Sequence, residues 1–218
     1  MGMGIAIGVL GAMVIGLVIL LKGQPDTSAE VDGASSSTAY EGTPLEGPAP
    51  DFRLKDQNGT LVSLADFRGT VVVLTLLDPV CTDICPLYAH QYRLAHQALG
   101  EDAANVAFLA FNANNEKTSV DTMAAATKKW GLDKMPNWHF LTGSPETLES
   151  VWSDYGLSAS GQPKPDKPDE KQHSPAIYII DQAGQRSRFL STNFEGAPPA
   201  SALIVEHVKA LLAPGHSG

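Results

Sequence analysis

The residues best suited to chemistry in this sequence are two cysteines, Cys81 and Cys85, with three residues between them and Pro86 directly after. Residues four apart on a tight turn or on the first turn of a helix can bring their side chains together. A helix N-terminus also stabilises a thiolate and lowers its pKa. The spacing therefore indicates a reactive or ligand-binding pair of thiols rather than two buried core thiols.

Metal binding and disulfide exchange are the chemistries that such a pair can support. A redox dithiol more usually has two intervening residues, so the bite of this pair is wider. A structural zinc site needs four ligands, and the chain has no second cysteine pair. Cu(I) is a soft ion that two thiolates and one imidazole can hold. The copper interpretation therefore requires a histidine close to both cysteines, which would complete a three-coordinate Cu(I) site or the equatorial part of a Cu(II) site.

The elements that must position the thiols follow an alternating α/β pattern. Residues 71–77 are a continuous apolar run rich in β-branched side chains, typical of a strand buried on both faces. The cysteines follow this strand at its carboxyl end, where α/β sheets bind ligands. Further strands are predicted over residues 51–54, 60–63, 106–111, 138–141, 176–180 and 186–190, and helices over 86–99, 121–130 and 201–212, with another helix opening at Ser144. This order predicts an α/β, thioredoxin-like fold with a central mixed sheet and flanking helices.

His173 is the best placed of the six histidines to join the two thiols. It ends a polar, proline-rich stretch, residues 157–172, which we expect to be a long loop, and it precedes an apolar strand. In a thioredoxin-like sheet the loop before that strand faces the cysteine turn, so the sequence predicts a metal site of Cys81, Cys85 and His173. The other histidines are interpreted as sheet, surface or tail residues, with His207 exposed on the last helix: His90, His96, His139, His207 and His216.

Acidic residues near the cysteines allow two interpretations. Asp83, between the cysteines, is either a hydrogen-bond acceptor supporting a ligand or a solvated turn residue, and Asp78 is similar. The mixed charges of the predicted loop are most simply a solvated surface: Lys164, Asp166, Lys167, Asp169, Glu170 and Lys171.

The N-terminal segment has the character of a membrane anchor. Residues 1–21 contain no charged side chain, and about 20 apolar residues suffice to cross a bilayer. No basic residue precedes the run, which favours an uncleaved anchor over a signal peptide. We expect a transmembrane anchor over residues 1–22, a flexible linker over 23–47, the folded domain over 48–213 and a tail over 214–218. Long downstream domains translocate largely regardless of charge, so we expect a single-pass protein of the cell membrane with its domain on the extracytoplasmic side.

The composition disfavours nucleic acid as a partner. The net charge is −9 and the pI is near 5.0. An acidic surface repels phosphate backbones.

Three motifs resemble the Sco/SenC family of thioredoxin-like copper chaperones: Cys81-x-Asp-x-Cys85-Pro86, the segment 138–143 and His173-Ser-x-x-x-Tyr178-x-Ile-Asp181-x-x-Gly184. The resemblance covers residues 47–212. It implies copper binding by Cys81, Cys85 and His173, delivery to the dinuclear copper site of cytochrome c oxidase, and one N-terminal anchoring helix with the domain outside.

The sequence departs from that family at two places near the cysteines. Thr82 stands where the family usually has proline, and Asn112-Ala113 replaces an Asp-Pro pair. Pro175 stands where thioredoxins carry a cis-proline. This position adds weight to thiol–disulfide exchange.

In the redox alternative the protein is a membrane-anchored thiol–disulfide oxidoreductase. Cys81, expected to be the more exposed thiol, would attack and Cys85 would resolve the mixed disulfide. A peroxidase is disfavoured, because Asp78 occupies the proline position of the peroxiredoxin motif.

Overall fold

The computed structural model describes residues 42–157, 159–173, 176–191 and 198–213. The predicted anchor (residues 1–22), most of the predicted linker, the tail and Pro175 lie outside the described residues. Among the helices in these described ranges, none combines the length and apolarity needed to cross a membrane.

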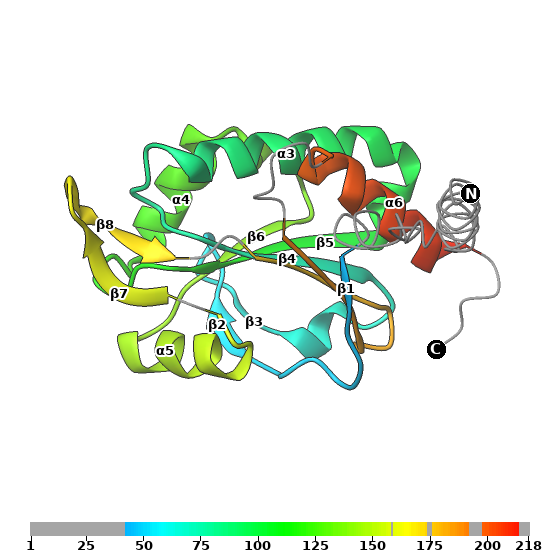
Figure 1. Ribbon diagram of the computed structural model, residues 1–218, viewed down its shortest axis with the longest axis horizontal. Helices are drawn as coiled ribbons and strands as arrows, with labels where there is room; N and C mark the ends of the chain where they lie inside the picture. The colour runs from blue at the N-terminus through cyan, green and yellow to red at the C-terminus, as the bar shows by residue number, and fades with distance from the viewer. Residues whose placement is uncertain (1–41, 158, 174–175, 192–197, 214–218) are drawn as a thin grey trace, which may run out of the picture. The chain divides into compact units, whose positions relative to one another are not determined.

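A six-stranded mixed sheet is the centre of the fold (Figure 1), in the order β1-β10-β9-β4-β5-β6. Strands β4, β5 and β6 run parallel, and β9 joins β4 in the antiparallel direction. The strand bounds are β1 Thr43–Pro44, β4 Val71–Leu77, β5 Val106–Asn112, β6 Trp138–Leu141, β9 Ile177–Ile180 and β10 Arg186–Leu190. The predicted α/β, thioredoxin-like fold with a mixed sheet is therefore confirmed.

Helices cover both faces of this sheet (Figure 1). Their bounds are α3 Ile84–Leu99, α4 Val120–Lys129, α5 Pro145–Asp154 and α6 Ala200–Leu212, with short 3-10 turns at Leu64–Phe67, Gly100–Asn105 and Leu132–Lys134. The ends of α3, α4 and α6 and the start of α5 agree with the predictions to within about two residues, the usual uncertainty of helix ends. The predicted first hairpin is also present, as β2 Arg53–Lys55 and β3 Leu61–Ser63.

Strand β4 is apolar throughout because it separates two hydrophobic cores. Val71 and Val73 pack in one core with residues of α3, α4 and α6. Val72 and Leu74 point the other way, into a core with α5 and the β2–β3 hairpin. Successive side chains of a strand alternate between its faces, so both faces of this strand must be hydrophobic. The double burial fixes the strand end from which the cysteines follow.

The predicted loop over residues 157–172 is wrong. This segment forms a second hairpin, β7 Ala159–Lys164 and β8 Lys167–His173, which is separate from the main sheet. Its register is irregular, and the buried side chains among those that the structure describes in it are Glu170 and Lys171. A strand whose buried contacts are polar lacks the apolar alternation by which strands are recognised.

The expectation that His207 is exposed is also wrong. Its side chain is buried on α6, within a run of buried residues at helical spacing: Leu203, Ile204, His207, Val208 and Leu211. His207 is buried because it lies on the apolar stripe of the helix, although the residue itself is polar.

Candidate metal and thiol site

The loop between β4 and α3 places the two cysteines together. Cys81 lies in the loop, where its backbone N–H donates to the Asp78 carbonyl at 3.1 Å. Cys85 lies in the first turn of α3, and its backbone N–H points to the Cys81 sulfur at 3.4 Å. Asp83 caps this helix, because its carboxylate accepts from the Ile84 N–H at 2.6 Å. The two cysteines are not joined in a disulfide and both are fully buried, so the expectation of a more exposed Cys81 is wrong.

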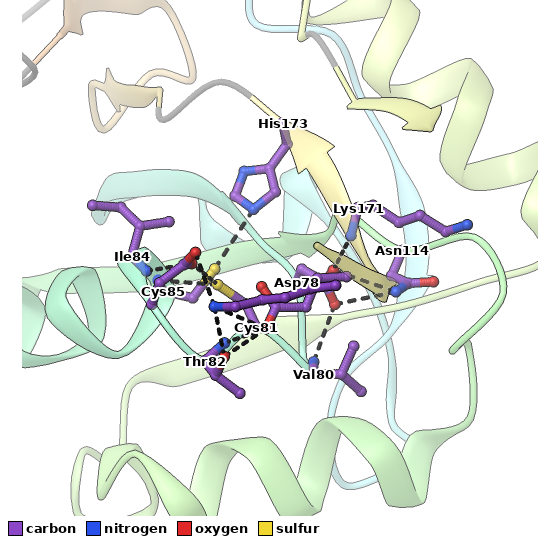
Figure 2. A network of polar contacts seen from close by, with 12 residues as sticks. Asp78, Val80, Cys81, Thr82, Ile84, Cys85, Asn114, Lys171 and His173 are labelled. Carbon is purple, nitrogen blue, oxygen red and sulfur yellow. Dashed lines mark hydrogen bonds and ion pairs between the residues drawn. The ribbon is translucent and has the colours of Figure 1, made fainter. Parts of the chain in front are cut away.

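His173 approaches this pair from the end of β8. Its Nε2 lies 3.5 Å from the Cys85 sulfur, across 88 residues of sequence. Figure 2 shows the ring directed at the sulfurs from the strand above the cysteine loop. The structure therefore brings together the three residues that the sequence predicted as a site.

The surroundings of the two thiols shift their pKa values in opposite directions. The pKa of Cys81 is lowered to about 5, first by the hydrogen bond from Cys85 and also by that from His173, against burial and the Asp83 carboxylate. Burial, and then the neighbouring Cys81, raise the pKa of Cys85 well above its ordinary value. At neutral pH the pair therefore holds one thiolate and one thiol.

Asp83 contacts the site directly, which decides between the two interpretations of this residue. Its Oδ1 accepts from the Cys81 sulfur at 3.0 Å, and its Oδ2 lies 3.3 Å from Lys167 Nζ. The Cys81 sulfur and carboxylate oxygens of Asp83 and Glu170 all lie within 4.8 Å of one another. Asp83 is thus an acceptor for Cys81 while that thiol carries its proton, so its carboxylate opposes ionisation of Cys81, and Lys167 of the hairpin supplies a cation beside the carboxylate.

Sequence reasoning missed the polar contacts between the hairpin and the cysteine loop. Glu170 and Lys171 are 4% and 1% exposed, so the interpretation as a solvated surface is wrong for these two residues, whereas Asp166 and Asp169 are exposed as expected. Asp78 is completely buried, which rules out a solvated turn residue, one of its two interpretations. The one sequence feature that could have indicated these contacts is Thr82, which stands where the family usually has proline. Glu170 accepts hydrogen bonds from both the N–H and the hydroxyl of Thr82.

The other described histidines make their contacts elsewhere. His90 is exposed and pairs with Arg93, and His139 lies 3.3 Å from the Asp56 carboxylate. His96 packs near Phe108. His216 lies outside the described residues.

The three convergent side chains fit a soft metal ion. Two sulfurs and one imidazole nitrogen are the donor types that Cu(I) prefers. His173 presents Nε2 to the sulfur, while its buried Nδ1 has no hydrogen-bond partner among the residues described. A ring held in this way offers Nε2 as the ligand atom, provided that Nδ1 carries the proton.

Comparison with known proteins places this arrangement in a family. The SCO1/SenC family model matches residues 42–209. The chain is 31% identical over 137 residues to the mitochondrial SCO2 homolog of Danio rerio, an alignment covering 62% of this chain and 48% of the relative. It covers between 48% and 63% of the length of the vertebrate relatives it matches.

Solved structures share the fold. Yeast Sco1 with copper bound has a TM-score of 0.60 at 25% identity, covering 79% of this chain and 92% of that one. BsSco, described as a member of the Sco family of cytochrome c oxidase assembly proteins with a disulfide switch, has a TM-score of 0.59 at 23% identity, covering 78% and 96%. With the family match spanning most of its length, the chain belongs to the SCO1/SenC family.

Proposed function

We propose that this chain is a metallochaperone that binds copper through Cys81, Cys85 and His173 and delivers it to the dinuclear copper site of cytochrome c oxidase. The observation that carries the proposal is the 3.5 Å approach of His173 Nε2 to the Cys85 sulfur, beside Cys81. The copper-bound structure of yeast Sco1 supports the cargo. The description of BsSco as an oxidase assembly protein supports the recipient.

In this proposal copper is cargo, and the protonation of the site controls its capture. Cys81 is already a thiolate at neutral pH because its pKa is about 5. Cys85 must give up its proton when copper binds, since metal ligands bind in their deprotonated form. Release would proceed by ligand exchange, in which thiols of the recipient replace those of the chaperone one at a time.

The proposal places the domain on the extracytoplasmic side of the cell membrane, held by residues 1–22. The uncharged apolar run of residues 1–21 supports the anchor. Fractionation of cells that make the full chain, with protease added to intact spheroplasts, tests this placement. Cleavage of the domain without lysis is expected, and full protection would contradict the orientation.

An anaerobic Cu(I) titration against a competing chelator tests the copper site. Cys81→Ser, Cys85→Ser and His173→Ala should each weaken affinity by more than about tenfold, since even groups that only support a metal ligand contribute about 10–100-fold. His90→Ala is the matched control, because His90 is an exposed histidine on α3 that contacts Arg93. Unchanged affinity in all three site variants would end the proposal.

Thiol–disulfide exchange is a second candidate function, favoured by the opposite pKa shifts of the two cysteines. The Cys81 thiolate would attack a substrate disulfide and release one substrate thiolate. Cys85, once deprotonated, would then attack the mixed disulfide, so the chain is oxidised to a Cys81–Cys85 disulfide and the substrate is reduced to two thiols. Rapid metal-free reduction of a model disulfide that persists in His173→Ala would favour this function over copper delivery.

A further inference from the structure

We propose that Asp78 and Glu170 are positioning residues, whose buried carboxylates hold β8 against the cysteine loop and thereby set the His173 ring at the sulfurs. The inference rests on the proposed copper function of this site and identifies what holds its third ligand in place. Figure 2 shows Asp78, Asn114 and Lys171 grouped beside the Cys81–Cys85–His173 cluster.

The Asp78 carboxylate joins three separate segments of the chain. It accepts from the Val80 N–H at 3.0 Å within its own loop and from Asn114 Nδ2 at 3.2 Å, in the loop after β5. Its other oxygen accepts from the backbone N–H of Lys171, on β8, at 2.7 Å. Asn114 Nδ2 also donates to the Asp169 carbonyl at 3.1 Å. This fully buried carboxylate therefore connects β8 to the carboxyl ends of β4 and β5.

The Glu170 carboxylate makes the second attachment. One oxygen accepts from the Thr82 N–H at 2.9 Å and from the Thr82 hydroxyl at 2.6 Å. Proline at position 82 could make neither bond, because it has no N–H and no hydroxyl. Lys167 Nζ lies 3.7 Å from the same oxygen, so the buried charge has a cation nearby. Thr82 thus binds the hairpin to the cysteine loop through Glu170.

Three consecutive residues of β8 are fixed by these contacts: Asp169 through its carbonyl, Glu170 through its side chain and Lys171 through its N–H. In the part of the chain that the structure describes, β8 pairs with β7 in a two-stranded sheet of their own. The main sheet therefore supplies no ladder of hydrogen bonds to hold this strand. Its position depends on side-chain contacts to the cysteine loop.

The attachment of β8 to the cysteine loop affects the metal site because His173 lies close to the attached residues. His173 lies two residues beyond Lys171, or about 7 Å along a strand. A ligand must be held to within about 0.5 Å of its working position. Because hydrogen bonds to a buried carboxylate are strong and costly to leave unmade, losing either carboxylate should let the end of β8 move by more than that.

The test compares Glu170→Ala and Asp78→Asn with two controls in the metal-free, reduced protein. Glu170→Gln retains an acceptor for Thr82. Asp166→Ala removes an exposed acid from the same hairpin. The readouts are hydrogen exchange of the Lys171 amide and the NMR signals of the His173 ring. Cu(II) is then added, and the sulfur-to-copper charge-transfer band and the affinity are measured.

Glu170→Ala and Asp78→Asn should each accelerate exchange at the Lys171 amide by about tenfold or more, shift the His173 ring signals and weaken Cu(II) affinity by about 10-fold to 100-fold with an altered charge-transfer band. Glu170→Gln should stay within about threefold of the wild type, and Asp166→Ala should not differ from it. Wild-type exchange and ring signals in both test variants would overturn the inference. If the wild type binds no copper, the proposed function fails, while the metal-free readouts still decide the role of the two carboxylates.

Discussion

Replacing Cys85 with alanine should raise the pKa of the Cys81 thiol, because the hydrogen bond from Cys85 is the largest of the interactions that lower it. With a pKa of about 5, Cys81 is about 99% thiolate at pH 7, whereas a thiol with the ordinary pKa of about 8.5 is about 3% thiolate. In the Cys85→Ala variant that hydrogen bond is gone, while burial and Asp83 still oppose ionisation of Cys81. The thiolate fraction of Cys81 at pH 7 should therefore fall most of the way from the higher of these two values to the lower.

Thiolate absorbance at 240 nm, followed from pH 4 to pH 10 in the metal-free reduced protein, measures this shift. The wild type should show one step of the coupled pair near pH 5, and Cys85 should keep its proton to far higher pH. His173→Ala should also raise the first step, by less than Cys85→Ala. Asp83→Asn should lower it, because that carboxylate opposes ionisation of Cys81.

The lowered pKa of Cys81 also makes the free energy of unfolding depend on pH. The folded-state pKa of Cys81 lies below that of the unfolded chain, so its contribution to the free energy of unfolding is fully present above about pH 8.5 and is lost as the pH falls through about 5. A first step near pH 8.5 in the wild type, or a step near pH 5 that survives in Cys85→Ala, would refute the reasoning.

Three further outcomes can be checked directly. Phe108→Ala should lower the free energy of unfolding by about 3–5 kcal/mol in urea titrations, because the ring is fully buried in the core, and a loss below about 1 kcal/mol would contradict that packing. Ser144→Ala should cost about 1 kcal/mol in the same assay, since the Ser144 hydroxyl caps α5 by accepting from the Thr147 N–H at 3.2 Å. Cu(I) affinity should fall steadily from pH 8 to pH 5, because Cys85, whose pKa is raised by burial, must lose its proton to bind the ion, and a pH-independent affinity would argue against this ligand.

The fold and the three convergent residues could be predicted because their signals are local. An apolar strand followed by Cys81 and Cys85 predicts thiols at the end of a buried strand, and the structure has that arrangement. His173 could be chosen by its place before the next apolar strand. Asp83 could be narrowed to two roles but not decided, because the choice depends on the orientation of one side chain.

The hairpin that carries His173 could not be predicted, for a physical reason. Its attachment is made by charged side chains and backbone groups, and pattern-based reasoning assigns charged residues to solvent. Glu170 and Asp78 are buried because each finds donors from another segment. Such long-range compensation leaves no periodicity in the sequence. His207 was predicted to be exposed for a different reason, because its polarity was given more weight than its place on the apolar stripe of α6.

The separation of 88 residues between Cys85 and His173 has a consequence for folding. An ion bound to both would act as a cross-link that closes a loop of chain, and closure of a loop this long lowers the entropy of the unfolded ensemble by an amount worth about 4–5 kcal/mol at room temperature. Any ligand that binds only the native state also shifts the folding equilibrium by mass action. Cargo and fold are then coupled, so the chain that has just released its copper is the form most exposed to unfolding and proteolysis.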